Sequence, residues 1–240
     1  MPQDCQELVE TYQAEGVIRV RKLFDADRMA GIRQALDRYS KQIAPTLPAS
    51  DVTFEADGQS VRNLWRMEQH DAFFSDLADD AQLLELVREL VQGEPVLMAV
   101  ETFNKPAKTG SGVPAHQDNA YFCRTPPDVL TVWVAVDPVT LANGPVSYVR
   151  GSHKLGMLPH KPSGVAGNSM GLDAPYDDSD PFVGTLEPGD ALMHHCQSIH
   201  YSAPNTTDQS RCGLLMVFRA EHAKVDSQLK GQYALGGPAT

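Results

Sequence analysis

Apolar residues in the first part of the chain recur at the three- and four-residue spacing of amphipathic helices. One helix is predicted from Ala26 to about Ile43, with Asp25 as its N-cap. A second is predicted between the N-cap Asp80 and the helix-ending residues Gly93 and Pro95. Their apolar faces consist of Met29, Ile32, Leu36 and Tyr39 in the first helix, and of Leu83, Leu84, Leu86, Val87 and Leu90 in the second.

The pattern changes near Val96, where short apolar runs separated by turn residues replace the helical spacing. Such runs are typical of buried strands. They cover residues 96–100, 129–136, 146–149, 191–193 and 212–218, and a shorter run at 17–20 predicts one early strand. The segments 45–58 and 154–180 are predicted to be loops. The second is long and rich in Gly, Pro, Ser and Asp, as is typical of a lid.

Short strands preceded by helices favour a mainly β fold with flanking α-helices, of the double-stranded β-helix, cupin-like jelly-roll kind. In such a rolled sheet, residues distant in sequence converge at one mouth. We expect a single domain over residues 1–240. It comprises a mainly helical amino-terminal part (1–95), a jelly-roll core (96–220) and a polar, frayed tail (221–240).

Composition narrows the classes of partner. The length of 240 residues suffices for one well-packed core, and the formal charge of -11 disfavours nucleic acid. The longest apolar stretch, 129–136, is too short to cross a bilayer, and the polar amino terminus has no secretory signal. The four cysteines show no C-x-x-C spacing. We therefore expect a cytoplasmic protein that acts on a small molecule and has no membrane or nucleic-acid partner. The sequence does not predict its oligomeric state.

The candidate chemistry lies in two short segments. One contains His116 and Asp118 in an H-x-D triplet; the other contains His200, with Arg211 downstream. Two imidazoles and one carboxylate form the ligand set that holds non-haem Fe(II) on one face and leaves the other face open. Alone, an H-x-D triplet is a weak signal that also fits an exposed polar turn.

Two alternatives stay open at this point. The run His194-His195-Cys196 offers ligands that zinc accepts, which would make the chain a zinc-dependent hydrolase. However, adjacent residues of a strand point to opposite faces, so His194 and His195 are poorly placed to share one ion. The other alternative is a non-catalytic jelly-roll binding protein.

Longer stretches around these residues resemble the phytanoyl-CoA dioxygenase family. The resemblance rests on residues 12–17, 115–122, 131–135, 143–145, 151–154 and 188–211, which together span most of the chain. It implies an Fe(II)- and 2-oxoglutarate-dependent oxygenase with a double-stranded β-helix. Fe(II), 2-oxoglutarate and O2 are the implied cofactor and co-substrates.

The resemblance also implies roles for individual residues. His116, Asp118 and His200 would ligate iron, and Arg211 would pair with the distal carboxylate of 2-oxoglutarate. A planar guanidinium suits that role because it makes two parallel hydrogen bonds to a carboxylate. The remaining co-substrate positions implied by the resemblance are Ser202, Thr131, Trp133 and, with its neighbour Lys105, Asn104.

The implied reaction hydroxylates or otherwise oxidises a C–H bond of a small metabolite or natural-product intermediate, with release of succinate and CO2. Asp118 favours this over halogenation, since related halogenases lack the carboxylate ligand. The sequence contains no basic cluster suited to CoA phosphates, which argues against an acyl-CoA substrate.

Overall fold

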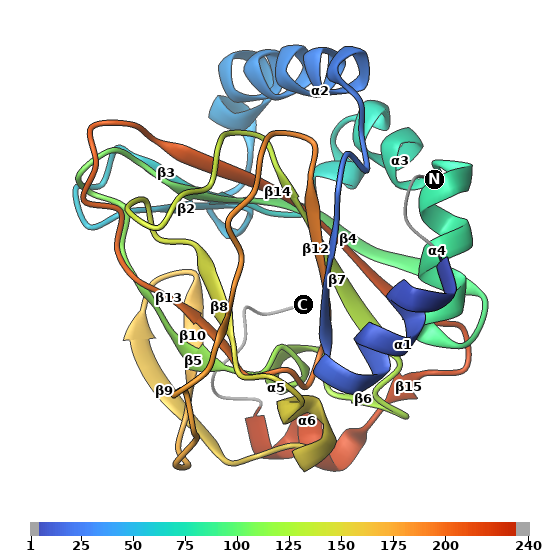
Figure 1. Cartoon of the computed structure of the whole chain (residues 1–240). Helices are drawn as coiled ribbons and strands as arrows, with labels where there is room; N and C mark the ends of the chain where they lie inside the picture. Colours follow the sequence, from blue (N-terminus) through green and yellow to red (C-terminus); the bar gives the residue numbers. More distant parts are fainter. Residues whose placement is uncertain (1–4, 234–240) are drawn as a thin grey trace.

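Two antiparallel sheets enclose the interior of the molecule in a computed structural model that describes residues 5–233 (Figure 1). The larger sheet has the strand order β1-β12-β7-β14-β4-β3-β2, and the smaller has the order β11-β8-β13-β5. Side chains of both sheets meet in one apolar cluster, which contains Trp133, Leu192 and Leu215 from the larger sheet and Tyr148 from the smaller. The predicted double-stranded β-helix is confirmed.

The larger sheet consists of β1 (Val17–Val20), β2 (Val52–Phe54), β3 (Val61–Leu64), β4 (Pro95–Lys105), β7 (Val129–Ala135), β12 (Ala191–His195) and β14 (Arg211–Ala220). The smaller consists of β5 (Val113–His116), β8 (Val146–Tyr148), β11 (Phe182–Val183) and β13 (His200–Ser202). Two further pairs are β9 (His160–Val165) with β10 (Asn168–Leu172), and β6 (Arg124–Thr125) with β15 (Lys224–Val225).

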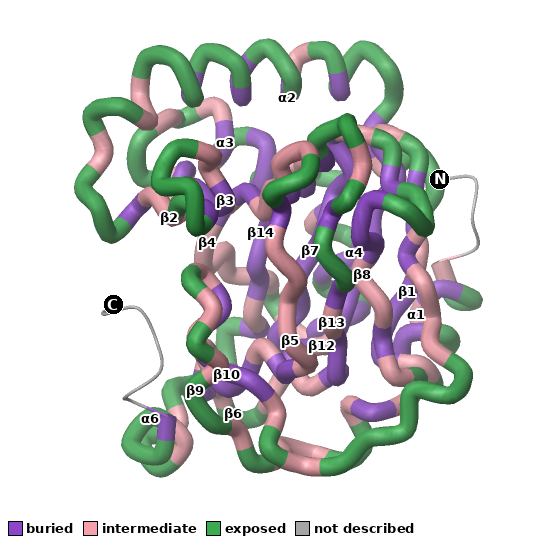
Figure 2. Tube along the Cα trace, turned by 90° about the vertical axis from the view of Figure 1, so that its left-hand side faces the viewer, coloured by how far each residue is buried: buried purple, intermediate pink, exposed green. Residues whose placement is uncertain are grey.

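The α-helices are α1 (Cys5–Glu15), α2 (Ala26–Arg38), α3 (Ala72–Ala78), α4 (Ala81–Val91), α5 (Asn119–Phe122) and α6 (Ser227–Tyr233). The first four cover the outer face of the larger sheet (Figure 1), where their apolar sides form the largest core cluster. Figure 2 shows that α2 is buried on this side and exposed on the other. No helix of the described residues is long and apolar enough to cross a membrane.

Both predicted N-caps are confirmed. The side chain of Asp25 accepts a hydrogen bond from the backbone N–H of Arg28 at 2.8 Å, which satisfies a donor that α2 itself leaves free. Asp80 accepts from two backbone N–H groups at the start of α4. After α2, one π-helical turn, Tyr39–Ile43, continues to the predicted end of the helix.

Strand β7 is buried along its whole length because helices cover one of its faces and the smaller sheet covers the other. Its residues alternate between the two faces. Leu130 and Val132 pack under the helices, whereas Thr131 and Trp133 point into the interior. This alternation decides which side chains of the larger sheet reach the site.

Three predicted segments differ in the structure. The amino-terminal part contains two strands that were not predicted, β2 and β3, which extend the larger sheet, and β2 lies within the predicted loop 45–58. The predicted loop 154–180 contains the β9–β10 hairpin, whose turn places Gly167 at a φ of 70°. Its Gly, Pro and Ser residues hide the alternation that marks a strand.

The described part of the polar tail forms regular structure, where the sequence predicted a frayed segment. Residues 224–233 form β15 and α6. Tyr233 of α6 is buried beside Ala120 and Cys123, and its hydroxyl donates to the backbone oxygen of Leu158 at 3.2 Å. Residues 234–240 lie outside the described part of the chain.

Candidate metal centre

The three predicted metal ligands come together at the mouth of the smaller sheet. His116 ends β5 and His200 begins β13, and the two residues are direct partners in the antiparallel pairing of these strands. Asp118 lies in the turn that leads from β5 into α5. The sheet register thus brings two segments that are distant in sequence into contact.

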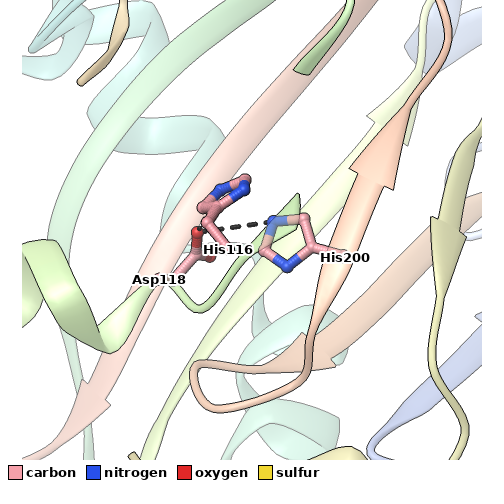
Figure 3. Close-up of side chains that lie close together, drawn as sticks. All are labelled: His116, Asp118 and His200. Carbon is pink, nitrogen blue, oxygen red and sulfur yellow. Dashed lines mark ion pairs between the residues drawn. The ribbon is translucent and has the colours of Figure 1, made fainter. Parts of the chain in front are cut away.

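The ligand atoms are close enough for one ion. His116 Nε2 lies 3.4 Å from Asp118 Oδ1, and His200 Nε2 lies 3.5 Å from the same oxygen (Figure 3). One suitable atom from each residue lies within 4.8 Å of the other two. An ion about 2.1 Å from each of three ligand atoms separates them by roughly 3 Å or slightly more. The observed spacing fits a single metal ion.

Backbone oxygens orient both imidazoles for metal binding. His116 Nδ1 lies 2.9 Å from the backbone oxygen of Pro114, and His200 Nδ1 lies 2.9 Å from that of Ser198. Because a carbonyl oxygen only accepts, each Nδ1 carries the proton and donates it. Each Nε2 therefore keeps its lone pair for a metal, which is the usual arrangement around ligating histidines.

Asp118 has a support of its own on the larger sheet. Its Oδ2 accepts hydrogen bonds from Thr131 Oγ1 at 3.0 Å and from His194 Nε2 at 3.1 Å. Tyr148 donates in turn to His194 Nδ1 at 3.0 Å. Since Oδ2 is held by two donors, Oδ1 is presented to the two ligating histidines.

The electrostatics of this group favour a cation. Burial lowers the pKa of His200 to about 3, and the neighbouring His116 adds to the effect, so the imidazole is neutral near pH 7. Burial alone would raise the pKa of Asp118, but His200, His116 and His194 hold it well below its ordinary value. Two neutral nitrogens and a carboxylate form a hard-to-intermediate donor set that suits Fe(II).

A second group of residues surrounds Arg211, at the start of β14. Arg211 is buried, donates to the backbone oxygen of Gly144, and stacks over the ring of Trp133 at 5.0 Å. A Cβ added at Gly213 would lie 2.1 Å from that ring, so only glycine lets Trp133 lie against β14. The Nε of Arg211 is buried and has no hydrogen-bond partner among the described residues.

Two further basic side chains lie near Arg211. Lys105 is its direct partner across β4 and β14, and burial, reinforced by Arg211 and Arg62, lowers the pKa of Lys105 to about 6. Arg62 forms a buried ion pair with Glu55 at 3.0 Å, and its Nε has no partner among the described residues. The two buried guanidinium groups, each with an unused Nε donor, fit a carboxylate ligand.

The other predicted co-substrate residues have different positions. Ser202 is buried and lines a cavity of about 640 Å³ together with Arg62, Val113 and Phe54. Asn104 does not join this group, because it lies on the opposite face of β4 from Lys105 and its amide donates to the backbone oxygen of Val61. Thr131 contacts Asp118 rather than the residues around Arg211.

Comparison with known proteins identifies the protein family. The sequence model of the phytanoyl-CoA dioxygenase (PhyH) family matches residues 12–213, and the chain belongs to this family. A probable phytanoyl-CoA dioxygenase of Caenorhabditis elegans is 37% identical over 158 residues, which is 57% of this chain and 50% of that protein. The chain thus spans about half the length of this relative.

Other relatives match over more of their length. A probable alpha-ketoglutarate-dependent hypophosphite dioxygenase of Stutzerimonas stutzeri is 25% identical over 226 residues, covering 88% of this chain and 77% of that protein. EctD from S. alaskensis with 2-oxoglutarate and 5-hydroxyectoine superposes with a TM-score of 0.76 at 20% identity, over 94% and 79% of the two chains.

The epimerase SnoN in complex with Fe3+, alpha ketoglutarate and nogalamycin RO has the same fold. Its TM-score is 0.76 at 19% identity, over 94% of this chain and 89% of that one. These structural similarities establish the shared jelly roll.

The predicted ligands and Arg211 were visible in the sequence, but several supporting residues were not. His194 attracted notice as a zinc ligand, whereas the structure places it as a hydrogen-bond donor to Asp118. His195 points the other way, towards Tyr12 and His153, as strand alternation requires. Tyr148 and Arg62 carried no signal, because each becomes part of the site only through the sheet register.

Proposed function

We propose that this chain is an Fe(II)- and 2-oxoglutarate-dependent oxygenase. It hydroxylates or otherwise oxidises a C–H bond of a small metabolite or natural-product intermediate, and it releases succinate and CO2. The main evidence is that His116, Asp118 and His200 lie together at one site. Backbone oxygens orient both imidazoles so that their Nε2 lone pairs point towards the position beside Asp118 Oδ1. The family to which the chain belongs supports this proposal.

His116, Asp118 and His200 would hold the iron. When bound, Fe(II) supplies the oxidising chemistry, in which 2-oxoglutarate is converted into succinate and CO2 and oxygen from O2 reaches the substrate. The protein's share is to fix three ligands on one side, which leaves the opposite side for the reactants. Thr131 and His194 hold Asp118 so that its carboxylate presents Oδ1.

The group around Arg211 would anchor the distal carboxylate of 2-oxoglutarate. Arg211 has an unused buried donor, Arg62 adds positive charge, and Lys105 adds more when it carries a proton. Ser202, two residues after the ligand His200, would add a hydroxyl donor, and Trp133 holds the guanidinium in place. Burial strengthens each of these interactions because little water competes for the carboxylate.

A small substrate is supported by the relatives. The hypophosphite dioxygenase and EctD carry names and ligands of small polar molecules, and SnoN is described with a natural product. All four cysteines are free thiols, which supports the expectation of a reducing, cytoplasmic setting.

The test is conversion of 2-oxoglutarate into succinate by the purified chain with added Fe(II), measured with and without O2. We expect succinate only when Fe(II) and O2 are both present, even without a primary substrate, at a slow uncoupled rate. A zinc hydrolase or a binding protein would give no succinate under either condition. Screening small metabolites for stimulation of this rate then identifies the substrate.

A further inference from the structure

The β9–β10 hairpin is fastened to the turn that carries the metal ligands. Gln117, between His116 and Asp118, donates from its side chain to the backbone oxygen of Gly156 at 2.8 Å and accepts from the N–H of Leu158 at 2.8 Å. Its backbone N–H donates to His160 Nε2 at 3.0 Å. The base of the hairpin and the ligand turn therefore form one connected unit.

One hairpin residue, Asn168, extends from β10 into the metal centre. It is 3% exposed, and its Nδ2 lies 3.3 Å from His116 Nε2, the nitrogen with the free lone pair. The same Nδ2 donates to the hydroxyl of Tyr121 at 3.1 Å. The other side-chain atom, Oδ1, is buried and has no hydrogen-bond partner among the described residues.

Tyr121 fixes the position of this amide. Its hydroxyl accepts from the backbone N–H of Met170 at 3.0 Å and donates to the backbone oxygen of Met170 at 3.2 Å. Its ring packs edge-on against His116, with the ring centroids 5.9 Å apart. Asn168 is thus held from two sides with its amide directed at the ligand nitrogen.

The lone pair of His116 Nε2 serves one partner at a time. With a metal on that nitrogen, the second N–H of Asn168 no longer has its acceptor, and Oδ1 already lacks a donor. A buried amide with a free N–H and a free C=O is costly, by about 1–3 kcal/mol for each unsatisfied group. Its presence next to the metal ligands indicates a hydrogen-bonding partner that arrives with the reactants.

We propose that Asn168 is a ligand-positioning residue of the active centre: its carboxamide borders the open side of the metal site and hydrogen-bonds the oxygen-bearing molecule bound there. This inference rests on the proposed function. The shared chemistry is an oxygen that accepts from the amide N–H. This oxygen belongs either to a carboxylate of 2-oxoglutarate or to a hydroxyl, carboxylate or amide group of the primary substrate. A primary-substrate group that also carries a hydrogen-bond donor can donate to Asn168 Oδ1.

The decisive experiment inserts a ligand at this position. Asn168→Asp is nearly isosteric and places a carboxylate where the amide lies, so Co(II) should bind at least about tenfold more tightly. The matched control is Lys161→Gln, which changes the net charge by the same amount on the solvent side of the hairpin, at a side chain 62% exposed. Co(II) titrations followed by visible absorption measure both affinities.

A second insertion keeps the test decisive if the Asp variant does not fold. Asn168→Cys adds no charge during folding, and its thiolate gives Co(II) a sulfur-to-metal charge-transfer band if it reaches the ion. Tighter Co(II) binding or this band supports the placement. Co(II) affinity within twofold of wild type in the Asp variant, or a folded Cys variant without the band, would overturn it.

Asn168→Ala then separates the two sources of oxygen. A roughly tenfold weaker binding of 2-oxoglutarate to the Co(II) protein identifies the co-substrate as the partner. Unchanged 2-oxoglutarate affinity, combined with tighter Co(II) binding by the Asp variant, assigns the amide to the primary substrate. These measurements need no turnover, so a failure to form succinate would remove the proposed oxygenase activity without deciding the placement of Asn168.

Discussion

The two ends of the interior differ in the charge that each is built to receive. At one end, two imidazoles and a carboxylate converge, with the pKa of His200 lowered to about 3. At the other, the guanidinium groups of Arg211 and Arg62 lie near Lys105, and burial together with their charge lowers the pKa of Lys105 to about 6. The first end suits a cation and the second a carboxylate, so a co-substrate with both a chelating and an anionic end fits between them.

The two ends also differ in how their side chains are held. Hydrogen bonds fix the metal end, because each ligand has a partner that determines which atom faces the ion. At the other end Arg211 lies against Trp133 and donates to the backbone oxygen of Gly144, but its Nε donor stays unused. Removing a hydrogen-bond partner should therefore impair metal binding, whereas removing a cation should impair 2-oxoglutarate binding.

The largest effect is expected from removing a proposed metal ligand. Asp118→Ala removes the sole carboxylate ligand of the proposed set and leaves His194 and Thr131 without their acceptor. Fe(II)-dependent succinate formation should fall below detection, and Co(II) titration should show the loss of binding. Persistent turnover in a folded variant would contradict the assignment of the ligand.

Breaking the anion-binding end should spare the metal. Arg211→Ala should weaken 2-oxoglutarate binding about 10- to 100-fold, because a charge-assisted hydrogen bond contributes about 1.5–3 kcal/mol. Co(II) affinity should stay as in wild type. Arg211→Lys keeps the charge but lacks the planar pair of donors, so its affinity should lie between the two. Wild-type-like 2-oxoglutarate affinity in the Ala variant is the result that excludes this role.

A smaller effect is expected when only the support of Asp118 is removed. His194→Phe deletes the donor to Oδ2 and should lower Co(II) affinity about tenfold, as loss of such partners typically does. His195→Phe is the matched control, since the side chain of His195 lies on the opposite face of β12 from His194, beside His153. Equal effects of the two substitutions would show that His194 acts through packing alone.

The smallest effect is a pH dependence of co-substrate binding. Lys105 has a pKa of about 6 in the folded chain, so it is mostly neutral above that pH. Binding of the 2-oxoglutarate carboxylate favours the protonated form, so Lys105 takes up a proton on binding at higher pH. The affinity for 2-oxoglutarate should therefore fall as pH rises from 6 to 8, by less than about tenfold in total. Lys105→Met should flatten this slope in calorimetric titrations. A slope unchanged in that variant would assign the proton to another group.

The same lowered pKa bears on stability, with a definite sign. Between pH 6 and the ordinary lysine range, the unfolded chain binds the proton that the folded Lys105 lacks. Stability from this residue therefore rises with pH across that window.

The proposed metal ligands and Arg211 could be predicted from the sequence, whereas the residues that hold them in position could not. His116, Asp118, His200 and Arg211 stand in short segments whose residue types already match the chemistry. The partner of Arg211 is Lys105 rather than Asn104, and these neighbours differ only in which face of β4 they occupy. A shift of one residue in register exchanges the faces, and composition alone does not fix that register.

The hairpin was the least predictable element near the site. Its strands contain Gly164, Pro162 and Gly171, which interrupt any alternation of apolar and polar residues. Its position depends on hydrogen bonds to Gln117 and Tyr121 from a segment distant in sequence. Such contacts leave no local pattern, so Asn168 became visible only in three dimensions.

The most direct test of the metal centre is an anaerobic titration of the Fe(II)-loaded chain with 2-oxoglutarate, followed by visible absorption. Chelation of Fe(II) by the 2-oxo acid should produce a metal-to-ligand charge-transfer band that is absent with Zn(II) and absent in Asp118→Ala. Admission of O2 should remove the band as succinate forms. An Fe(II)-loaded wild-type chain that shows no band at saturating 2-oxoglutarate would contradict the proposed oxygenase centre.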